Sequence, residues 1–185
     1  NKLAAYVRNS MPFTVSIGVS SICNDILHVR ACYHEAQDSL QNKFYIGGDF
    51  IFHYTKMEEF INHFPPALKI SDRYLDAVKE GDEKRVEKEL DFMMQSLKNI
   101  KDEAYIRNFC MCIISETYRI YFESFQQGDH FSLDNSFFVY EKLMACDTID
   151  NLFKTVKISA LDIATQIKER YKDHRNYLMY SISNY

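Results

Sequence analysis

The sequence predicts an α+β fold that is mostly α-helical, and three observations carry that prediction. Residues 14–19 are rich in β-branched side chains and are bounded by a proline and a pair of serines, as buried strands often are. Beyond residue 67, apolar side chains recur at spacings of three and four in successive stretches, which is the helical pattern. Gly and Pro number only 5 and 3 in 185 residues, which favours helix over disorder. We therefore expect a small sheet-and-helix piece followed by an all-helical bundle of about five helices.

A domain boundary is expected at Pro65 and Pro66, the only adjacent prolines, because they stop any strand or helix that approaches them. Before this boundary, a helix from about Leu27 to Lys43 follows the first strand. Residues 46–54 then read as a turn and a second strand. Residues 1–64 are thus predicted to form one α+β piece.

The helical part is expected to begin with an antiparallel hairpin. The first helix starts near Leu68 and ends at Gly81, a residue that readily adopts the left-handed conformation of a helix end. Asp82 can then cap a second helix, whose apolar residues form a single stripe from Val86 to Leu97. A two-residue connection of this kind brings the two helices together.

Three further helices are predicted. The first, at about 102–127, has a wide apolar face and should be central; the next starts at Ser132 or Asp134. The last follows Asp147 or Thr148 and keeps a spacing of three and four for more than twenty residues, which is typical of a long packed or coiled-coil-forming helix. Its candidate helix-packing and dimerisation residues are Ile149, Val156, Ile163 and Ile167.

Composition excludes several classes of protein. The formal charge of −4 does not provide the positive surface of a nucleic-acid-binding protein. No window of apolar residues is long enough to span a membrane, and residues 1–8 lack the apolar core of a secretion signal. Five cysteines without disulfide spacing fit a reduced, cytoplasmic protein, although a membrane tether elsewhere in a longer chain remains compatible.

No catalytic, metal-binding or cofactor-binding residue is predicted. Cys110 and Cys112 are two apart in a helical pattern, so they point to different faces and cannot readily hold one ion. The histidines show no ligand spacing, and no Gly-x-Ser-x-Gly nucleophile motif is present. The six histidines are His28, His34, His53, His63, His130 and His174.

Two other patterns have simple structural readings. The charge-dense stretch 80–89 is expected to be a solvated helix face, stabilised by weak pairs between residues four apart, Glu80 with Lys84 and Arg85 with Glu89. Met93, Met94 and Met111 are expected to fill the core rather than line an adaptable groove.

One region resembles a known family. The Val-Ser-Ile-Gly strand at 15–18 is followed by a helix that carries a characteristic set of residues, namely Tyr33, Glu35, Ala36, Leu40 and Lys43. This run resembles the last third of a GGDEF-type domain, in the degenerate form found upstream of the DNA-binding domain in AraC-type transcriptional regulators. Gly47 and Gly48 match the turn after the family's helix, which needs glycine because its backbone adopts positive φ. Such a partial sheet leaves an open edge that tends to recruit a second chain.

The same resemblance argues against enzymatic activity. Residues 47–50 read Gly-Gly-Asp-Phe, close to the signature of diguanylate cyclases, but in those enzymes the signature precedes the strand instead of following it. Active members also carry an Ala-Asp pair at the helix start, where this chain has Ala31 and Cys32. We expect no cyclase activity.

The last nine residues, 177–185, resemble the opening of the first helix of an AraC-type helix-turn-helix domain. The expected organisation is therefore a degenerate GGDEF-like part at 1–64, a helical regulatory or linker domain at 65–176, and the start of a DNA-binding domain at 177–185. The resemblance implies that the coding frame continues into a basic helix-turn-helix domain.

The function implied is that of a non-catalytic regulatory and dimerisation segment of an AraC-type transcription factor. It would relay a signal from an upstream sensor or receiver domain of the same chain to a C-terminal DNA-binding domain, acting as a homodimer. The first alternative is an effector-binding module, with a closed, partly polar cavity for a small ligand or peptide lined by Tyr105, Tyr118 or Tyr121. The second is a vestigial diguanylate cyclase.

Overall fold

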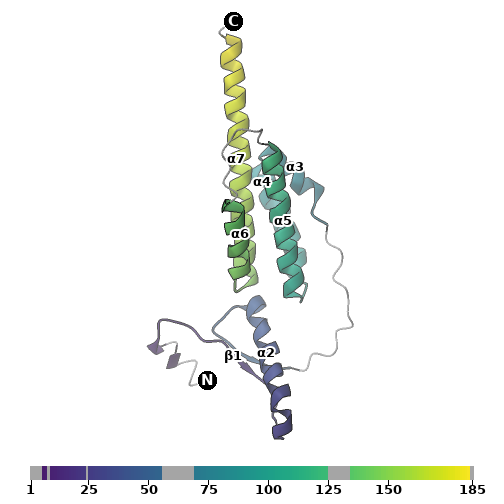
Figure 1. Ribbon diagram of the computed structural model, residues 1–185, viewed down its shortest axis with the longest axis vertical. Helices are drawn as coiled ribbons and strands as arrows, with labels where there is room; N and C mark the ends of the chain where they lie inside the picture. The colour runs from purple at the N-terminus through teal and green to yellow at the C-terminus, as the bar shows by residue number, and fades with distance from the viewer. Residues whose placement is uncertain (1–5, 8, 24, 56–68, 125–133, 184–185) are drawn as a thin grey trace. The chain divides into compact units, whose positions relative to one another are not determined.

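A computed structural model describes residues 6–7, 9–23, 25–55, 69–124 and 134–183, and side chains beyond residue 173 and at 134–137 are outside the description. The chain divides into two compact units (Figure 1). The first comprises Asn1–Phe64 with Asp147–Asp150, and the second comprises Pro65–Cys146 with Asn151–Tyr185. The predicted boundary at Pro65 and Pro66 lies outside the described residues. The described chain is mostly helical with one small parallel sheet, which confirms the predicted fold class.

In the first unit, a strand, a helix and a second strand follow one another. Strand β1 (Ile17–Val19) leads through a short 3-10 turn η1 (Ile26–His28) into helix α2 (Val29–Ile46), and β2 (Ile51–His53) then pairs parallel to β1. The strands pair in the register Ile17–Ile51, Gly18–Phe52 and Val19–His53. Both are shorter than predicted, whereas the predicted helix is present and extends three residues past Lys43.

Gly18 is required by the close packing of α2 on β1. A Cβ atom at this position would lie 2.1 Å from the carbonyl oxygen of Ala36 and 2.8 Å from the nearest atom of Leu40, so no larger residue fits without separating helix and strand. The predicted positive φ after the helix is found at Gly47 (99°), but the second such residue is Asp49 (69°) and not Gly48. The Asp49 amide donates to the Ser16 hydroxyl (3.1 Å), which ties this turn to the start of the sheet.

The second unit begins with the predicted hairpin. Helix α3 (Asp72–Glu80) ends at Gly81, which adopts the left-handed conformation (φ 65°), and the amides of Gly81 and Asp82 donate to the carbonyls of Val78 and Ala77. Helix α4 (Glu83–Leu97) begins directly afterwards, and the Asp82 side chain accepts a hydrogen bond from the Arg85 amide (3.1 Å). Both ends of the two-residue connection are therefore satisfied as the sequence predicted.

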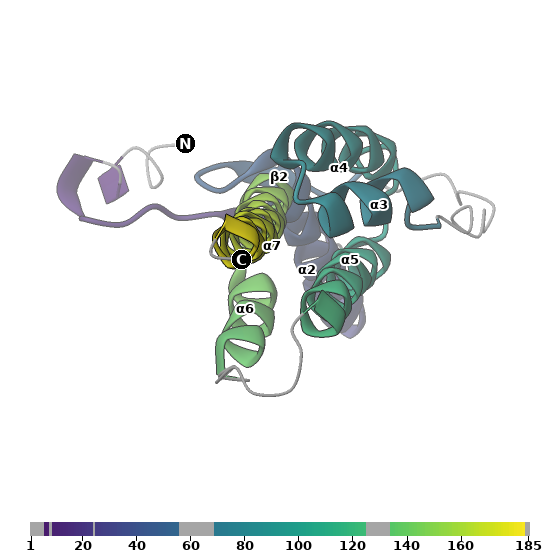
Figure 2. The same cartoon turned by 90° about the horizontal axis from the view of Figure 1, so that it is seen from above.

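Three further helices complete this unit: α5 (Glu103–Ser124), α6 (Asp134–Ala145) and α7 (Ile149–Ser183). Their starts lie within about two residues of those predicted. Viewed end-on, α7 lies beside α6, and α3 lies between α4 and α5 on the side away from α6 and α7 (Figure 2). Helix α7 continues without interruption through residue 177, so 177–183 form one helix with the preceding residues and not a separate element.

The core of the second unit draws on α3, α4, α5, α6 and α7. Val86, Leu90, Met93, Met94 and Leu97 form the buried stripe of α4, as predicted, while Met111 is only half-buried. Tyr74 on α3 and Thr117 on α5 are hydrogen-bonded inside this core through their hydroxyl oxygens (2.5 Å). Burial raises the pKa of the Tyr74 hydroxyl, which therefore stays neutral.

Candidate functional site

Helix α7 is the candidate functional element, because the predicted packing residues lie on it. Ile149, Val156, Ile163 and Ile167 are all buried, at 5% exposure or less. Leu152, Ala160 and Ala164 complete the same stripe and are fully buried. These side chains are enclosed within the protein's own chain, so they are not available to a second copy unless the fold opens.

Two lysines on one side of this stripe join α7 to α4. Lys157 forms ion pairs with Glu87 and Asp91, both at 3.0 Å, and Lys168 pairs with Glu83 at 2.7 Å. The side chain of Lys157 is only 28% exposed, and the hydrogen bonds that its ammonium group donates to Asp91 and Glu87 raise the pKa of that group. We call this contact, made by Glu83, Glu87, Asp91, Lys157 and Lys168, the lysine seam.

The turn of the α3–α4 hairpin also touches α7. A Cβ atom at Gly81 would lie 2.8 Å from the backbone nitrogen of Lys168 and 2.9 Å from its Cα atom. Glycine is thus needed at position 81 for two reasons: the backbone adopts a positive φ there, and it closely approaches the backbone of α7. The lysine seam therefore begins where the turn before α4 approaches the backbone of α7.

On the α5 side, one polar contact holds α7. The Tyr121 hydroxyl donates to the side-chain oxygen of Gln166 (2.8 Å), and the Gln166 amide nitrogen donates to Asp162 (2.9 Å). Tyr121 is itself almost completely buried. The contact fixes the rotation of α7 against α5, since the amide can reach only one angular position on the helix.

Arg107 on α5 holds the end of α6, immediately before α7. Its guanidinium donates to the carbonyl oxygens of Leu143 (3.0 Å) and Cys146 (2.7 Å) and to the Glu103 carboxylate (2.8 Å). The side chain is 16% exposed, so these are sheltered, charge-assisted bonds to carbonyls at a helix end. Arg107 thereby determines where the chain turns into α7.

Beyond the packed region, α7 projects past the ends of its neighbours in the second unit (Figure 1). Among the described side chains of this helix, which end at residue 173, Ile167 is the last that is buried, and Tyr171 is 53% exposed. The part that projects is thus a direct continuation of the part held by the lysine seam, Tyr121 and Arg107.

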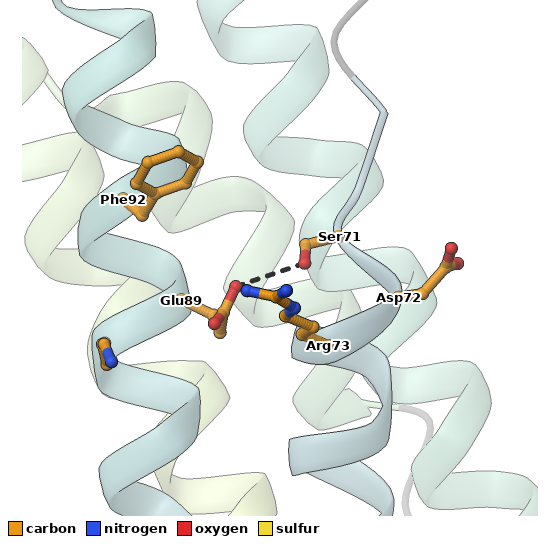
Figure 3. Close-up of a pocket in the computed structure, with 6 residues that line it drawn as sticks. Ser71, Asp72, Arg73, Glu89 and Phe92 are labelled. Atoms are coloured by element: carbon orange, nitrogen blue, oxygen red, sulfur yellow. Dashed lines mark hydrogen bonds between the residues drawn. The ribbon is translucent and has the colours of Figure 1, made fainter.

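A groove of about 460 Å³ lies between α3 and α4. It is lined by Ser71, Asp72, Arg73, Lys88, Glu89 and Phe92. Figure 3 shows Arg73 pointing toward α4 beside Glu89, which accepts a hydrogen bond from the Ser71 hydroxyl (3.2 Å), whereas Asp72 points away. The groove is open and mostly charged, and the large ring of Phe92 is exposed at its end.

The residues proposed for a closed effector cavity are placed elsewhere. Tyr118 and Tyr121 are buried on α5, and Tyr105 is half-buried and stacks on the ring of Phe109. The hydroxyl of Tyr121 is already used by Gln166. None of the three lines the groove between α3 and α4.

Metal-ligating side chains do not converge in the described parts of the chain. No group of three or more His, Cys, Asp or Glu side chains there could hold an ion. Cys110 is buried and Cys112 is exposed, which confirms that they face different sides of α5. His63 and His130 lie outside the described residues, as does the side chain of His174.

Sequence reasoning did not anticipate the lysine seam or the role of Arg107. The charged stretch 80–89 was expected to pair within its own helix, but Glu83 and Glu87 reach lysines of α7, and Arg85 pairs with Glu80 across Gly81. A signal was present for Arg107, because Glu103 and Arg107 have the favourable spacing of four residues. For the seam, the available signal was the spacing of eleven residues between Lys157 and Lys168, which places both lysines at the same edge of an apolar stripe.

None of the described helices combines the length and apolar character needed to cross a membrane. Comparison of the chain with known protein families, with curated proteins and with solved structures found no match.

Proposed function

We propose that this chain is a non-catalytic regulatory segment of an AraC-type transcriptional regulator, in which α7 transmits a change in the helical unit to a DNA-binding domain beyond residue 185. The observation that carries the proposal is the continuity of α7: one helix is anchored by the lysine seam and Arg107 and then leaves the bundle. A helix moves as a rigid element over this length, so a displacement at the anchored end appears at the projecting end.

The first unit supports the resemblance on which this proposal rests. Its strand, helix, turn and strand follow the order of the degenerate GGDEF-type domain, and Gly18 of the Val-Ser-Ile-Gly motif is required by close packing. The fragment has no proposed catalytic role, and the whole regulator is proposed to be cytoplasmic and to receive its signal from an upstream sensor or receiver domain.

The first unit is also where we propose that two copies meet. In the described sheet, each strand has one neighbour, so each presents an unpaired edge. The same unit exposes large apolar side chains, namely Ile22, Ile26, Leu27 and Tyr33. Because the four predicted dimer residues of α7 are buried, we assign the homodimer contact to this region and the packing role to α7.

One experiment tests the proposal in two parts. Sedimentation equilibrium of the 185-residue chain should show a monomer–dimer equilibrium that the Leu27→Asp variant shifts toward monomer. The matched control is Ile158→Asp, which changes an exposed residue on the outer face of α7 and should leave the equilibrium unchanged. A gel-shift assay should show DNA retardation only by the longer gene product.

Two results would contradict the proposal. The first is a chain that remains monomeric at all concentrations, since a relay between two DNA readers requires two copies. The second is GTP turnover or DNA retardation by the 185-residue chain alone.

A further inference from the structure

The groove between α3 and α4 has binding groups that the rest of the fold does not use. Its volume of about 460 Å³ falls within the range of ligand sites, roughly 300–1,000 Å³, but it is open to solvent. None of the residues that hold α7, namely those of the lysine seam, Tyr121 and Arg107, lines it. A partner can therefore occupy the groove without breaking the contacts of the relay proposed above.

Two positive side chains line the groove without an ion pair. Arg73 on α3 and Lys88 on α4 are both exposed, and Figure 3 shows Arg73 pointing toward α4. Among the described residues, no ion pair includes either of them. Other cations in and beside the same hairpin do have partners: Lys69 pairs with Asp72, Lys79 with Asp76, and Arg85 with Glu80. Arg73 and Lys88 are thus available to an external anion.

The carboxylates beside the groove are engaged elsewhere. Asp72 pairs with Lys69 (2.9 Å) and points away from the groove. Glu89 is half-buried and accepts a hydrogen bond from the Ser71 hydroxyl (3.2 Å). The carboxylates of the lysine seam pair with the lysines of α7. The acidic groups around the groove therefore have partners of their own, whereas its two cations do not.

An aromatic ring lies at the end of the groove. Phe92 is 72% exposed and follows Lys84 and Lys88 at intervals of four residues, so the three side chains form one row along α4. Lys84 is also exposed, and no ion pair among the described residues includes it. Along this row the helix rises about 6 Å from Lys88 to Phe92. The groove thus presents positive charge and, one helical turn further, an apolar ring.

We propose that this groove docks an acidic segment of a partner protein, which carries one large apolar residue about one helical turn from its carboxylates. The carboxylates pair with Arg73 and Lys88, because a guanidinium and a carboxylate can form two parallel hydrogen bonds. The apolar residue packs on the ring of Phe92, and aromatic and Arg side chains are enriched in protein interfaces.

The charges of the chain favour this occupant over a nucleic acid. A phosphate backbone carries negative charge along its whole length, so it would also face Glu89 and a chain with a formal charge of −4. A peptide can place its carboxylates only opposite Arg73 and Lys88. Because a single groove buries less surface than the roughly 1,200 Å² of a stable complex, we expect a dissociation constant of about 1–100 μM.

Selection from a random peptide library tests the chemistry of the occupant. A phage library of random 12-residue peptides is panned on the immobilised 185-residue chain. The enriched peptides should be rich in Asp and Glu and should carry a Phe, Leu, Ile or Trp three or four positions from an acidic residue. In fluorescence polarisation, such a peptide should bind at least about five-fold more weakly in 500 mM than in 50 mM NaCl, since salt screens exposed charges.

Surface variants locate the binding site. Arg73→Glu, Lys88→Glu and Phe92→Ala should each weaken binding of the selected peptide about ten-fold or more. All three side chains are exposed, so circular dichroism at 222 nm should show an unchanged fold. The matched control is Lys154→Glu, which reverses an exposed cation on α7 outside the groove and should change the affinity by less than about two-fold.

A charge exchange completes the experiment. A selected peptide whose acidic residues are replaced by Lys should bind the double variant Arg73→Glu, Lys88→Glu and not the unsubstituted chain. Failure to enrich acidic peptides, or equal binding by the groove variants, would overturn the proposal. Retardation of single-stranded DNA that depends on Arg73 and Lys88 would also overturn it, because the groove would then belong to a nucleic acid. The peptide-binding outcomes require neither a dimer nor a DNA-binding domain, so they are independent of the function proposed above.

Discussion

The two units of this protein differ sharply in how they enclose apolar surface. In the described residues up to 55, only two large apolar side chains are buried, Phe44 and Phe52. In the second unit, every helix contributes to a continuous buried core, and many of its side chains are fully inaccessible. The first unit also leaves Ile22, Ile26 and Leu27 more than 80% exposed.

The difference shows what each unit can do by itself. Two three-residue strands and one helix cannot surround a core, because one face of the helix and both edges of the sheet stay open. Helices packed in two layers do surround one. We therefore expect the second unit to unfold cooperatively, and the first to depend on further contacts.

The largest predicted effect comes from opening the core of the second unit. Leu90→Ala removes a fully buried side chain and should lower the free energy of unfolding by roughly 2–5 kcal/mol. Phe52→Ala, the matched change in the first unit, should leave the main transition almost unchanged. Urea denaturation followed by circular dichroism at 222 nm measures both. Equal losses would show that the two units share one cooperative core.

A smaller effect is expected at the turn that touches α7. Gly81→Ala adds a Cβ atom at positive φ and against the Lys168 backbone, which should cost about 2–4 kcal/mol through strain and overpacking. The control is Gly48→Ala, where the nearest atom to a new Cβ would be 3.5 Å away. Thermal unfolding measures the loss of stability in both variants. If Gly48→Ala is destabilised as much as Gly81→Ala, the contact between the turn and α7 does not explain the effect.

The smallest effect concerns the lysine seam. Lys157→Met should cost roughly 0.5–1 kcal/mol, as partly exposed ion pairs do, and Lys154→Met, at an exposed position on the same helix, should cost less. Because the pKa of Lys157 is raised by folding, its contribution is complete below the unfolded pKa of about 10.4 and is lost as pH rises through the folded value. The difference between the variants in urea midpoint should thus shrink above pH 10.5 or so. A difference that is constant with pH would contradict the ion-pair explanation.

The sequence was sufficient to predict structure wherever that structure depends on residues close together in the chain. Gly81, Asp82 and the apolar stripe of α4 are local signals, and the hairpin they predict is present. The burial of Val156 and Ile167 was also predictable, because a stripe at helical spacing must face a partner. The helix that this stripe of α7 packs against was not predictable, since contacting residues such as Glu83 and Lys168 are 85 positions apart in the sequence.

Because helix α7 is uninterrupted, the number of residues after Ile167 determines the direction in which a following segment faces. Each residue advances an α-helix by about 1.5 Å and turns it by about 100°. One residue gained or lost after the anchored part would swing the following segment by more than a quarter of a circle, whereas a change of seven or eleven would nearly restore its heading. In related chains, the length of the helix after Ile167 should accordingly differ by seven or eleven residues. Such changes keep the direction in which the following segment faces and alter only its distance from the bundle.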